Sequence, residues 1–186
     1  MSSLRYITGR GGTGQGGLSA YLKTLSEDFS VLAIDPDFLA QSFEEQVAAT
    51  RRFCAIDNAH IIANSYGAYL LLQSLIDQPP LPAEVLLLSP VLGRAMDPDR
   101  MLLSRPPRER TLREAIEAQR LGLPLSLSIV TGREDEICDW KLATLFADAL
   151  GANISVLDNE GHMISPATVS AAVHKFIGIR LRVGFR

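Results

Sequence analysis

The sequence predicts an α/β protein, a three-layer α/β/α sandwich on a mostly parallel sheet of about six strands. Short apolar runs of strand length alternate with longer segments of helical periodicity along the chain. That alternation is typical of a parallel sheet covered by helices on both faces. No internal repeat or low-complexity linker interrupts it, so we expect a single domain over residues 1–186, long enough to bury a substantial core.

Six runs rich in apolar and β-branched residues have the length of buried strands. In chain order they are Leu4–Thr8, Val31–Ile34, Ala59–Ala63, Val85–Leu88, Leu125–Val130 and Ile154–Leu157.

The intervening helices have recognisable ends. Ser42-Phe43-Glu44-Glu45 and Thr111-Leu112-Arg113-Glu114 both have the form of a capping box, in which side chains bond the free N–H groups of the first turn. Asp139 is expected to cap a helix that ends at Gly151, and Ser165-Pro166 to open one that ends at Gly178. The residues expected to face inward are Leu142, Leu145, Phe146, Ala149 and Leu150 in the first of these two helices, and Val169, Ala172, Val173, Phe176 and Ile177 in the second.

The third strand is followed directly by a serine and then by an apolar helical run. Ser65 has Ala63 two residues before it and Gly67 two residues after it. A nucleophile elbow needs small residues at these flanks because its strand-to-helix turn is tight, and the turn then projects the serine hydroxyl clear of the sheet. The usual pattern is G-x-S-x-G, and a methyl group replaces the first glycine here. The pattern therefore predicts a nucleophilic serine.

An acid and a histidine follow two later strands. Asp135 comes after the Leu125–Val130 strand, and His162 after the Ile154–Leu157 strand. Catalytic groups of open parallel sheets collect at the carboxyl ends of the strands, so Ser65, Asp135 and His162 are expected at one edge. Their chain order of Ser, Asp and His is that of the α/β-hydrolases and differs from the chymotrypsin-like and subtilisin-like orders.

With these motifs the chain resembles a compact serine hydrolase of the α/β-hydrolase superfamily. In size and in its Asn-Ser-x-Gly elbow it is similar to the small retinoblastoma-binding-protein-9-like hydrolases, and the resemblance runs from the Gly-rich turn to His162. It implies a minimal α/β-hydrolase fold and a serine hydrolase, carboxylesterase-like, that cleaves an ester, thioester or amide of a small-molecule substrate. Ser65 would be the nucleophile, His162 the general base and acid, and Asp135 the residue that orients His162.

The resemblance also implies an oxyanion hole made of backbone N–H groups. One donor would be Tyr66, directly after the nucleophile, and the second would be Arg10 or Gly11 in the loop after the first strand. The family usually has His-Gly at that loop, whereas this chain has Thr8-Gly9. No metal or other cofactor is implied.

One motif favours a different class of protein. Gly9–Gly14 fits G-x-G-x-x-G after the first strand, and Asp35 follows the second strand, as in the NAD(P)-binding fingerprint of Rossmann-type proteins. That interpretation leaves the Ser65 corner and the His162 turn unexplained, and the same loop is glycine-rich in α/β-hydrolases. A catalytically silent binding protein on the hydrolase fold is the third alternative.

Other residues compete for the acid and nucleophile positions. Glu134, Glu136 and Asp139 flank Asp135, which we favour because it stands three residues after Gly132. No histidine is placed beside Cys54 or Cys138 by the strand-end argument, so thiol catalysis is not expected, and no cluster has metal-ligand spacing.

Composition predicts a cytoplasmic protein. The N-terminus runs straight into a strand without a signal-peptide core, and two cysteines are too few for a disulfide framework. The formal charge of −3 gives no reason to expect nucleic acid, and no apolar run is long enough for a membrane span.

Residues 92–122 form the longest interval between expected strands and are the expected place of a small lid. Its segment 94–113 carries six arginines, interpreted mainly as a solvated helix face paired with nearby acids, and the interval also has a few apolar residues that could line an acyl pocket. An interval this short cannot build a large cap, so a shallow, open acyl site and a preference for short acyl esters are expected. The arginines are Arg94, Arg100, Arg105, Arg108, Arg110 and Arg113, and the apolar residues are Met96, Met101, Leu102 and Leu103.

Overall fold

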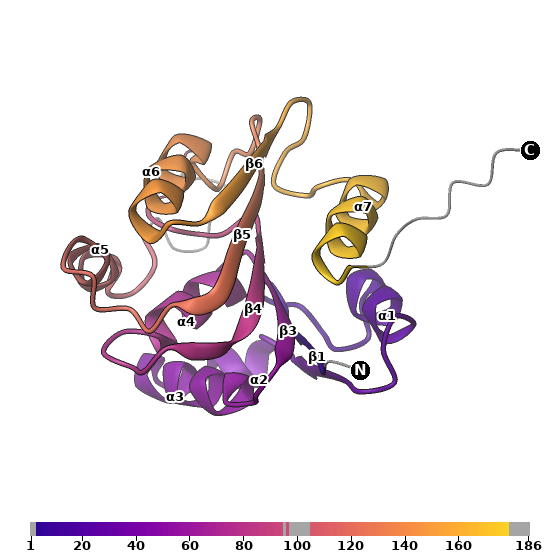
Figure 1. The fold of residues 1–186 in the computed structure, drawn as a ribbon, viewed down its shortest axis with the longest axis horizontal. Helices are drawn as coiled ribbons and strands as arrows, with labels where there is room; N and C mark the ends of the chain where they lie inside the picture. Colours follow the sequence, from indigo (N-terminus) through magenta and orange to yellow (C-terminus); the bar gives the residue numbers. More distant parts are fainter. Residues whose placement is uncertain (1–2, 95, 97–104, 179–186) are drawn as a thin grey trace, which may run out of the picture.

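The computed structural model describes residues 3–94, 96 and 105–178. In this part of the chain, a six-stranded sheet of order β2-β1-β3-β4-β5-β6 lies between two layers of helices (Figure 1). All neighbouring strands are parallel. The predicted three-layer α/β/α sandwich is confirmed, and the sheet is wholly parallel in the described residues.

All six expected strands are present, with shifted ends. Ile34 lies beyond the end of β2, yet it is fully buried, and its N–H is donated to Thr8 Oγ1 at 2.8 Å. The strand β4 begins four residues before its apolar run because Leu81 already pairs with Pro124 of β5. The bounds are β1 Leu4–Ile7, β2 Phe29–Leu32, β3 Ala59–Asn64, β4 Leu81–Leu88, β5 Pro124–Gly132 and β6 Asn153–Leu157.

The two faces of the sheet are covered unequally. The larger core lies under α3, α4, α5 and α6, and the smaller core lies under α1 and α7. Figure 1 shows these two groups of helices on opposite sides of the sheet. Alternate strand residues supply the two cores, as the period of a strand requires. The helices are α1 Gly17–Lys23, α2 Pro36–Leu39, α3 Phe43–Cys54, α4 Tyr66–Ser74, α5 Glu109–Glu117, α6 Trp140–Leu150 and α7 Pro166–Phe176.

Of the two expected capping boxes, one is confirmed and one is wrong. Ser42 and Glu45 bond each other's backbone N–H groups at the start of α3. Thr111 lies inside α5, which begins at Glu109 after Arg108 in a left-handed conformation. Gln73 of α4 fixes this earlier start by donating a hydrogen bond to the Arg108 carbonyl at 3.1 Å. A tertiary contact has therefore overridden the local capping signal.

The expected ends of α6 are confirmed, and its inward face is confirmed in part: Phe146 and Leu150 are buried, and Leu142 packs against the larger core. Asp139 accepts a hydrogen bond from the Lys141 N–H, and Gly151 ends the helix with φ +64°. Leu145 is 64% exposed and Ala149 is also exposed, whereas Ala143 and Ala147 are fully buried. The buried stripe is thus displaced toward small residues, which let α6 lie close to the sheet.

The inward face of α7 is as expected. Val173 is fully buried in the smaller core, and four other α7 residues pack against that core. Gly178 follows the helix with φ +72°, a left-handed conformation that glycine adopts without strain. The four packing residues are Val169, Ala172, Phe176 and Ile177.

In the described part of the expected 92–122 lid, α5 packs one face against the larger core. Leu112, Ala115 and Ile116 of α5 are buried. Its arginines are exposed and form ion pairs, Arg110 with Glu114 and Arg113 with the partly buried Glu109, so they belong to a solvated helix face. Arg100, Met101, Leu102 and Leu103 lie outside the described residues.

No helix in residues 3–94 and 105–178 is long and apolar enough to cross a membrane. Both cysteines, Cys54 and Cys138, are buried free thiols.

The two capping sequences give a matched pair of substitutions. Ser42→Ala should lower the free energy of unfolding by about 1 kcal/mol, because it leaves the Glu45 N–H without its cap. Thr111→Ala should change it by less than about 0.5 kcal/mol, since Thr111 is exposed within the helix. Urea unfolding of both variants measures the difference. Equal losses would mean that Thr111 caps α5 after all.

Candidate active site

Ser65 occupies a strained corner between β3 and α4. Its backbone has φ +51° and ψ −116°, a conformation that costs a non-glycine residue about 1–3 kcal/mol. Hydrogen bonds to the chain around β4 hold it there: the Ser65 N–H donates to the Leu88 carbonyl at 2.9 Å, and the Val91 N–H donates to the Ser65 carbonyl at 3.2 Å. The expected strand-to-helix elbow is therefore present in its backbone geometry.

The residues around the corner have no room for larger side chains. A Cβ on Gly67 would lie 2.2 Å from the Thr8 carbonyl oxygen, so only glycine fits. Ala63 is fully buried, and its methyl group is accommodated. A Cβ on Gly9 would lie 3.3 Å from Ser65 Cβ, which places the Gly-rich loop directly beside the serine.

The three residues expected to form a triad lie in contact. Ser65 Oγ is 3.0 Å from His162 Nε2, and His162 Nδ1 is 3.1 Å from both carboxylate oxygens of Asp135. The Asp135 side chain is fully buried, and the His162 side chain is 13% exposed. They follow the carboxyl ends of β3, β5 and β6, three strands that the sheet holds in fixed order. This arrangement can pass a proton from the serine hydroxyl to an oriented imidazole.

Backbone donors fix the direction of the Asp135 carboxylate. Its Oδ1 atom accepts the N–H groups of Ile137 at 2.9 Å and Cys138 at 2.7 Å. Two rival acids have other surroundings: Asp139 caps α6, and Glu134 is exposed. Of these three, Asp135 contacts the histidine.

The loop that carries His162 is tied to the end of β5. The Glu134 N–H donates to the Glu160 carbonyl at 3.0 Å, and a Cβ on Gly132 would lie 2.0 Å from that same oxygen. The Glu160 carboxylate accepts hydrogen bonds from Ser165 and Thr168 at the start of α7, and these bonds lower the pKa of Glu160. The acid and histidine loops therefore form one connected unit.

The two alternatives for the second oxyanion donor, Arg10 and Gly11, differ in their backbone hydrogen bonds. The Gly11 N–H is donated to the Ile34 carbonyl at 2.7 Å, since this bond closes the loop onto the end of β2. The Arg10 N–H makes no hydrogen bond to any described residue, which leaves it available. Tyr66 is the first residue of α4, where the N–H has no partner within the helix. The Arg10 guanidinium lies 5.6 Å from the centre of the Tyr66 ring, so these two residues are neighbours.

The Gly-rich loop does not take the form of a dinucleotide site. In that fingerprint the pyrophosphate lies on the N-terminus of a helix that the glycines open. Here α1 begins only at Gly17, three residues after Gly14. The Asp35 carboxylate, expected at a ribose in that interpretation, accepts the Phe38 N–H at 2.9 Å as the cap of α2.

Cys138 is a neighbour of the triad that sequence reasoning missed. Its sulfur lies 3.6 Å from His162 Nδ1 and donates to the Ser89 carbonyl at 3.0 Å. Burial, and then the nearby Asp135 charge, raise the pKa of this thiol well above its ordinary value. The signal that could have found it is its place three residues after Asp135, in the same turn.

Asp135, Cys138 and His162 are also a group that could surround a metal ion, since their ligand atoms lie within 4.8 Å of one another. Metal binding would need the Cys138 thiolate, which the raised pKa disfavours, and would need to replace the His162–Asp135 contact. The chemistry of this group therefore fits a triad better than a metal site.

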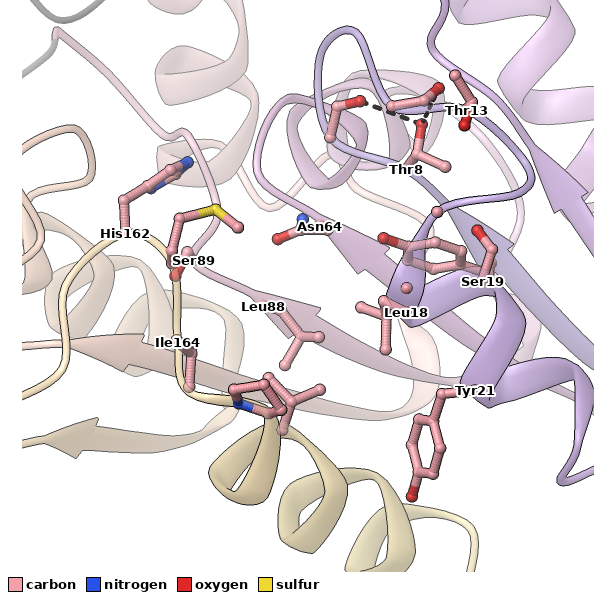
Figure 2. A pocket seen from close by; sticks show the side chains of 18 of the residues that line it. Thr8, Thr13, Leu18, Ser19, Tyr21, Asn64, Leu88, Ser89, His162 and Ile164 are labelled. Atoms are coloured by element: carbon pink, nitrogen blue, oxygen red, sulfur yellow. Dashed lines mark hydrogen bonds between the residues drawn. The ribbon is translucent and has the colours of Figure 1, made fainter.

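A cavity of about 600 Å³ opens beside His162. It lies between the Gly-rich loop, α1, α7 and the ends of β3 and β4; Figure 2 shows Leu18, Leu88 and Ile164 around it. It is on the face of α1 and α7, the opposite face of the sheet from α5. None of the described residues of the expected 92–122 lid lines this cavity.

The fold and the site define a class: an α/β-hydrolase fold with a serine, a histidine and an acid at the carboxyl edge of its sheet. Residues 37–171 match the serine hydrolase family, and the chain belongs to that family. This match spans Ser65, Asp135 and His162. The chain is therefore a serine hydrolase.

Solved structures share this fold. The ydeN gene product of Bacillus subtilis is 14% identical, with a TM-score of 0.64 over 96% of this chain and 100% of that one. A carboxylesterase from Nitrososphaera gargenis is 13% identical, with a TM-score of 0.62 over 96% and 90%. A carboxylesterase from Bacillus subtilis is 16% identical, with a TM-score of 0.57 over 95% and 83%. No curated protein matches the sequence.

The protonated state of Cys138 leads to a prediction about inactivation. Iodoacetamide at neutral pH should leave ester hydrolysis of the native protein nearly unchanged, because it reacts with thiolates and this thiol is buried with a raised pKa. Residual activity and the mass of the protein measure the outcome. Rapid inactivation with alkylation at Cys138 would show that the thiol is accessible and reactive, contrary to this prediction.

Proposed function

We propose that the protein cleaves carboxylic esters through an acyl-enzyme on Ser65, with His162 as general base and acid and Asp135 as the residue that orients it. The observation that carries the proposal is the unbroken contact from Ser65 Oγ to His162 and on to the buried Asp135 carboxylate. The backbone N–H groups of Tyr66 and Arg10 are the proposed oxyanion donors.

In the first half of the reaction, Ser65 Oγ attacks the ester carbonyl carbon as His162 Nε2 removes the hydroxyl proton. Asp135 keeps the proton of His162 on Nδ1 and stabilises the imidazolium. The tetrahedral oxyanion accepts hydrogen bonds from the two backbone donors, each worth about 2.7–4 kcal/mol of barrier. The C–O bond to the alcohol then breaks, and His162 gives its proton to the leaving oxygen.

In the second half, water takes the place of the alcohol. His162 removes a proton from the water, whose oxygen attacks the acyl carbon. The bond to Ser65 Oγ breaks, the proton returns to the serine, and the carboxylic acid leaves. The cycle is balanced by one water molecule and needs no metal or other cofactor.

The choice of an ester is supported by the fold relatives. Two of them are described as carboxylesterases. The same machinery also attacks thioesters and amides, so these remain bonds to be tested on the same triad. We further propose that the chain acts as a single domain on a small-molecule acyl substrate. Two free thiols support a reducing, cytoplasmic location.

The nucleophile is tested by covalent labelling. A fluorophosphonate should modify Ser65, and Ser65→Ala should abolish labelling and reduce kcat on the order of 10⁶-fold. Ser74→Ala, at the other end of α4, is the matched control and should keep both. Intact-protein mass spectrometry and p-nitrophenyl ester hydrolysis are the measurements. Unchanged hydrolysis in Ser65→Ala would refute the mechanism, and wild-type protein without any hydrolysis would indicate a catalytically silent binding protein.

The acid is tested by charge removal without a change of shape. Asp135→Asn should fold but lose kcat on the order of 10⁴-fold, since the amide favours the wrong tautomer of His162. Asp139→Asn should keep its rate, because asparagine also caps helices. Steady-state kinetics on both variants, with circular dichroism to check folding, gives the comparison. The reverse outcome would move the acid to Asp139.

A further inference from the structure

The cavity beside His162 has walls suited to an uncharged apolar group. Its side chains include Leu18, Leu88, Ile164 and Val169. Among the described residues that line it, none is acidic, and Arg10 and His162 are the basic ones. Its volume of about 600 Å³ is in the range of about 300–1,000 Å³ that pockets for small molecules occupy. A cationic acyl chain would lose hydration there without an acidic partner, and the mostly apolar side chains offer little to an anionic chain away from Arg10.

The position of the cavity relative to the reacting atoms favours the acyl half of the substrate. Its wall includes Gly9 and Arg10 of the Gly-rich loop, Asn64 just before the nucleophile, and His162. The acyl carbon must lie among all three of these groups, since it is bonded to Ser65 and its oxygen faces the Arg10 N–H. The leaving oxygen needs only His162. A chain attached to the acyl carbon would therefore start among all of these cavity-lining residues, whereas a chain on the alcohol would start only beside His162.

The side of the cavity formed by α1 and α7 is held by a polar contact. The Tyr21 hydroxyl of α1 hydrogen-bonds Ser170 Oγ at 2.8 Å and His174 Nε2 at 3.1 Å, both on α7. Figure 2 shows Tyr21 and His162 on opposite sides of the cavity. This contact joins the two helices at one side of the cavity, so a long acyl chain is expected to reach a limit there.

We infer that the cavity between α1 and α7 is the acyl pocket, and that the substrates are esters of uncharged, apolar acids of medium chain length. This inference rests on the proposed Ser65 mechanism. It replaces the expectation of a shallow site that prefers short acyl groups, because a cavity of about 600 Å³ lies next to His162, on the other face of the sheet from α5.

The first test is a p-nitrophenyl ester series from acetate to dodecanoate with the full-length protein. The ratio kcat/KM should rise by up to about fourfold per methylene, the fold-change given by about 0.8 kcal/mol per buried CH₂, and by at least about tenfold from acetate to octanoate. It should then stop rising as the cavity is filled. A flat or falling profile from acetate onward would overturn the inference.

The second test fills the cavity from one wall. Val169→Phe should reduce kcat/KM for the octanoate at least tenfold while the acetate changes by less than about twofold. Ala171→Phe is the matched control on the exposed face of α7 and should leave the profile unchanged. If Val169→Phe fails to fold in a thermal melt, Leu18→Phe on the opposite wall replaces it. Equal losses for both esters, or no loss for either, would contradict the assignment.

Two further experiments distinguish a failure of the proposed function from a failure of the acyl-pocket inference. A small fluorophosphonate labels Ser65 whatever the chain preference is, so its failure to label would refute the proposed function itself. Labelling together with a flat acyl profile would refute the acyl pocket alone. A series of alkyl acetates varies the alcohol instead, and a rise there without a rise in the acyl series would assign the cavity to the leaving group and overturn the inference.

Discussion

The left-handed backbone at Ser65 is the constraint on which the site depends. A side chain at φ +51° is unfavourable by itself, so neighbouring chain segments must hold it. The chain around β4 supplies two hydrogen bonds, through Leu88 and Val91, and β1 supplies the close contact between Thr8 and Gly67. Both are available because β3 lies between β1 and β4 in the sheet. The serine corner is therefore a consequence of strand order as much as of its own sequence.

A second constraint joins the other two triad residues. Gly132 ends β5 where a side chain would collide with the Glu160 carbonyl, and the Glu134 N–H bonds that same carbonyl. The loops that carry Asp135 and His162 are thus packed backbone to backbone. Glu160 extends this connection into α7 through Ser165 and Thr168. Because α7 also forms a wall of the cavity, the position of the imidazole and the shape of the pocket depend on the same contacts.

Features that depend on local sequence pattern and on strand order could be predicted from the sequence. All six strands, the Ser65 corner and the meeting of Ser65, Asp135 and His162 could be predicted, since apolar runs and turn residues report them directly. Features that depend on contacts between residues far apart in the chain could not be predicted. The start of α5 is set by Gln73, and the Gly11 N–H is taken by Ile34, and neither partner is near in the chain. The cavity has no sequence motif, because the space between helices depends on how they pack.

The uneven cover of the sheet explains where a small hydrolase can find room for a substrate. Of the described helices, only α1 and α7 cover the face that holds the cavity, whereas α2 to α6 cover the other face. At the entrance to α1, Gly16 and Gly17 line the cavity, and a Cβ added to Gly17 would meet no atom within 4 Å. Because Gly16 and Gly17 have no side chains, this part of the cavity stays unfilled. The glycines that resembled a nucleotide fingerprint meet packing needs instead: Gly9 lies against Ser65, and a Cβ on Gly12 would lie 2.6 Å from Thr8 Cβ.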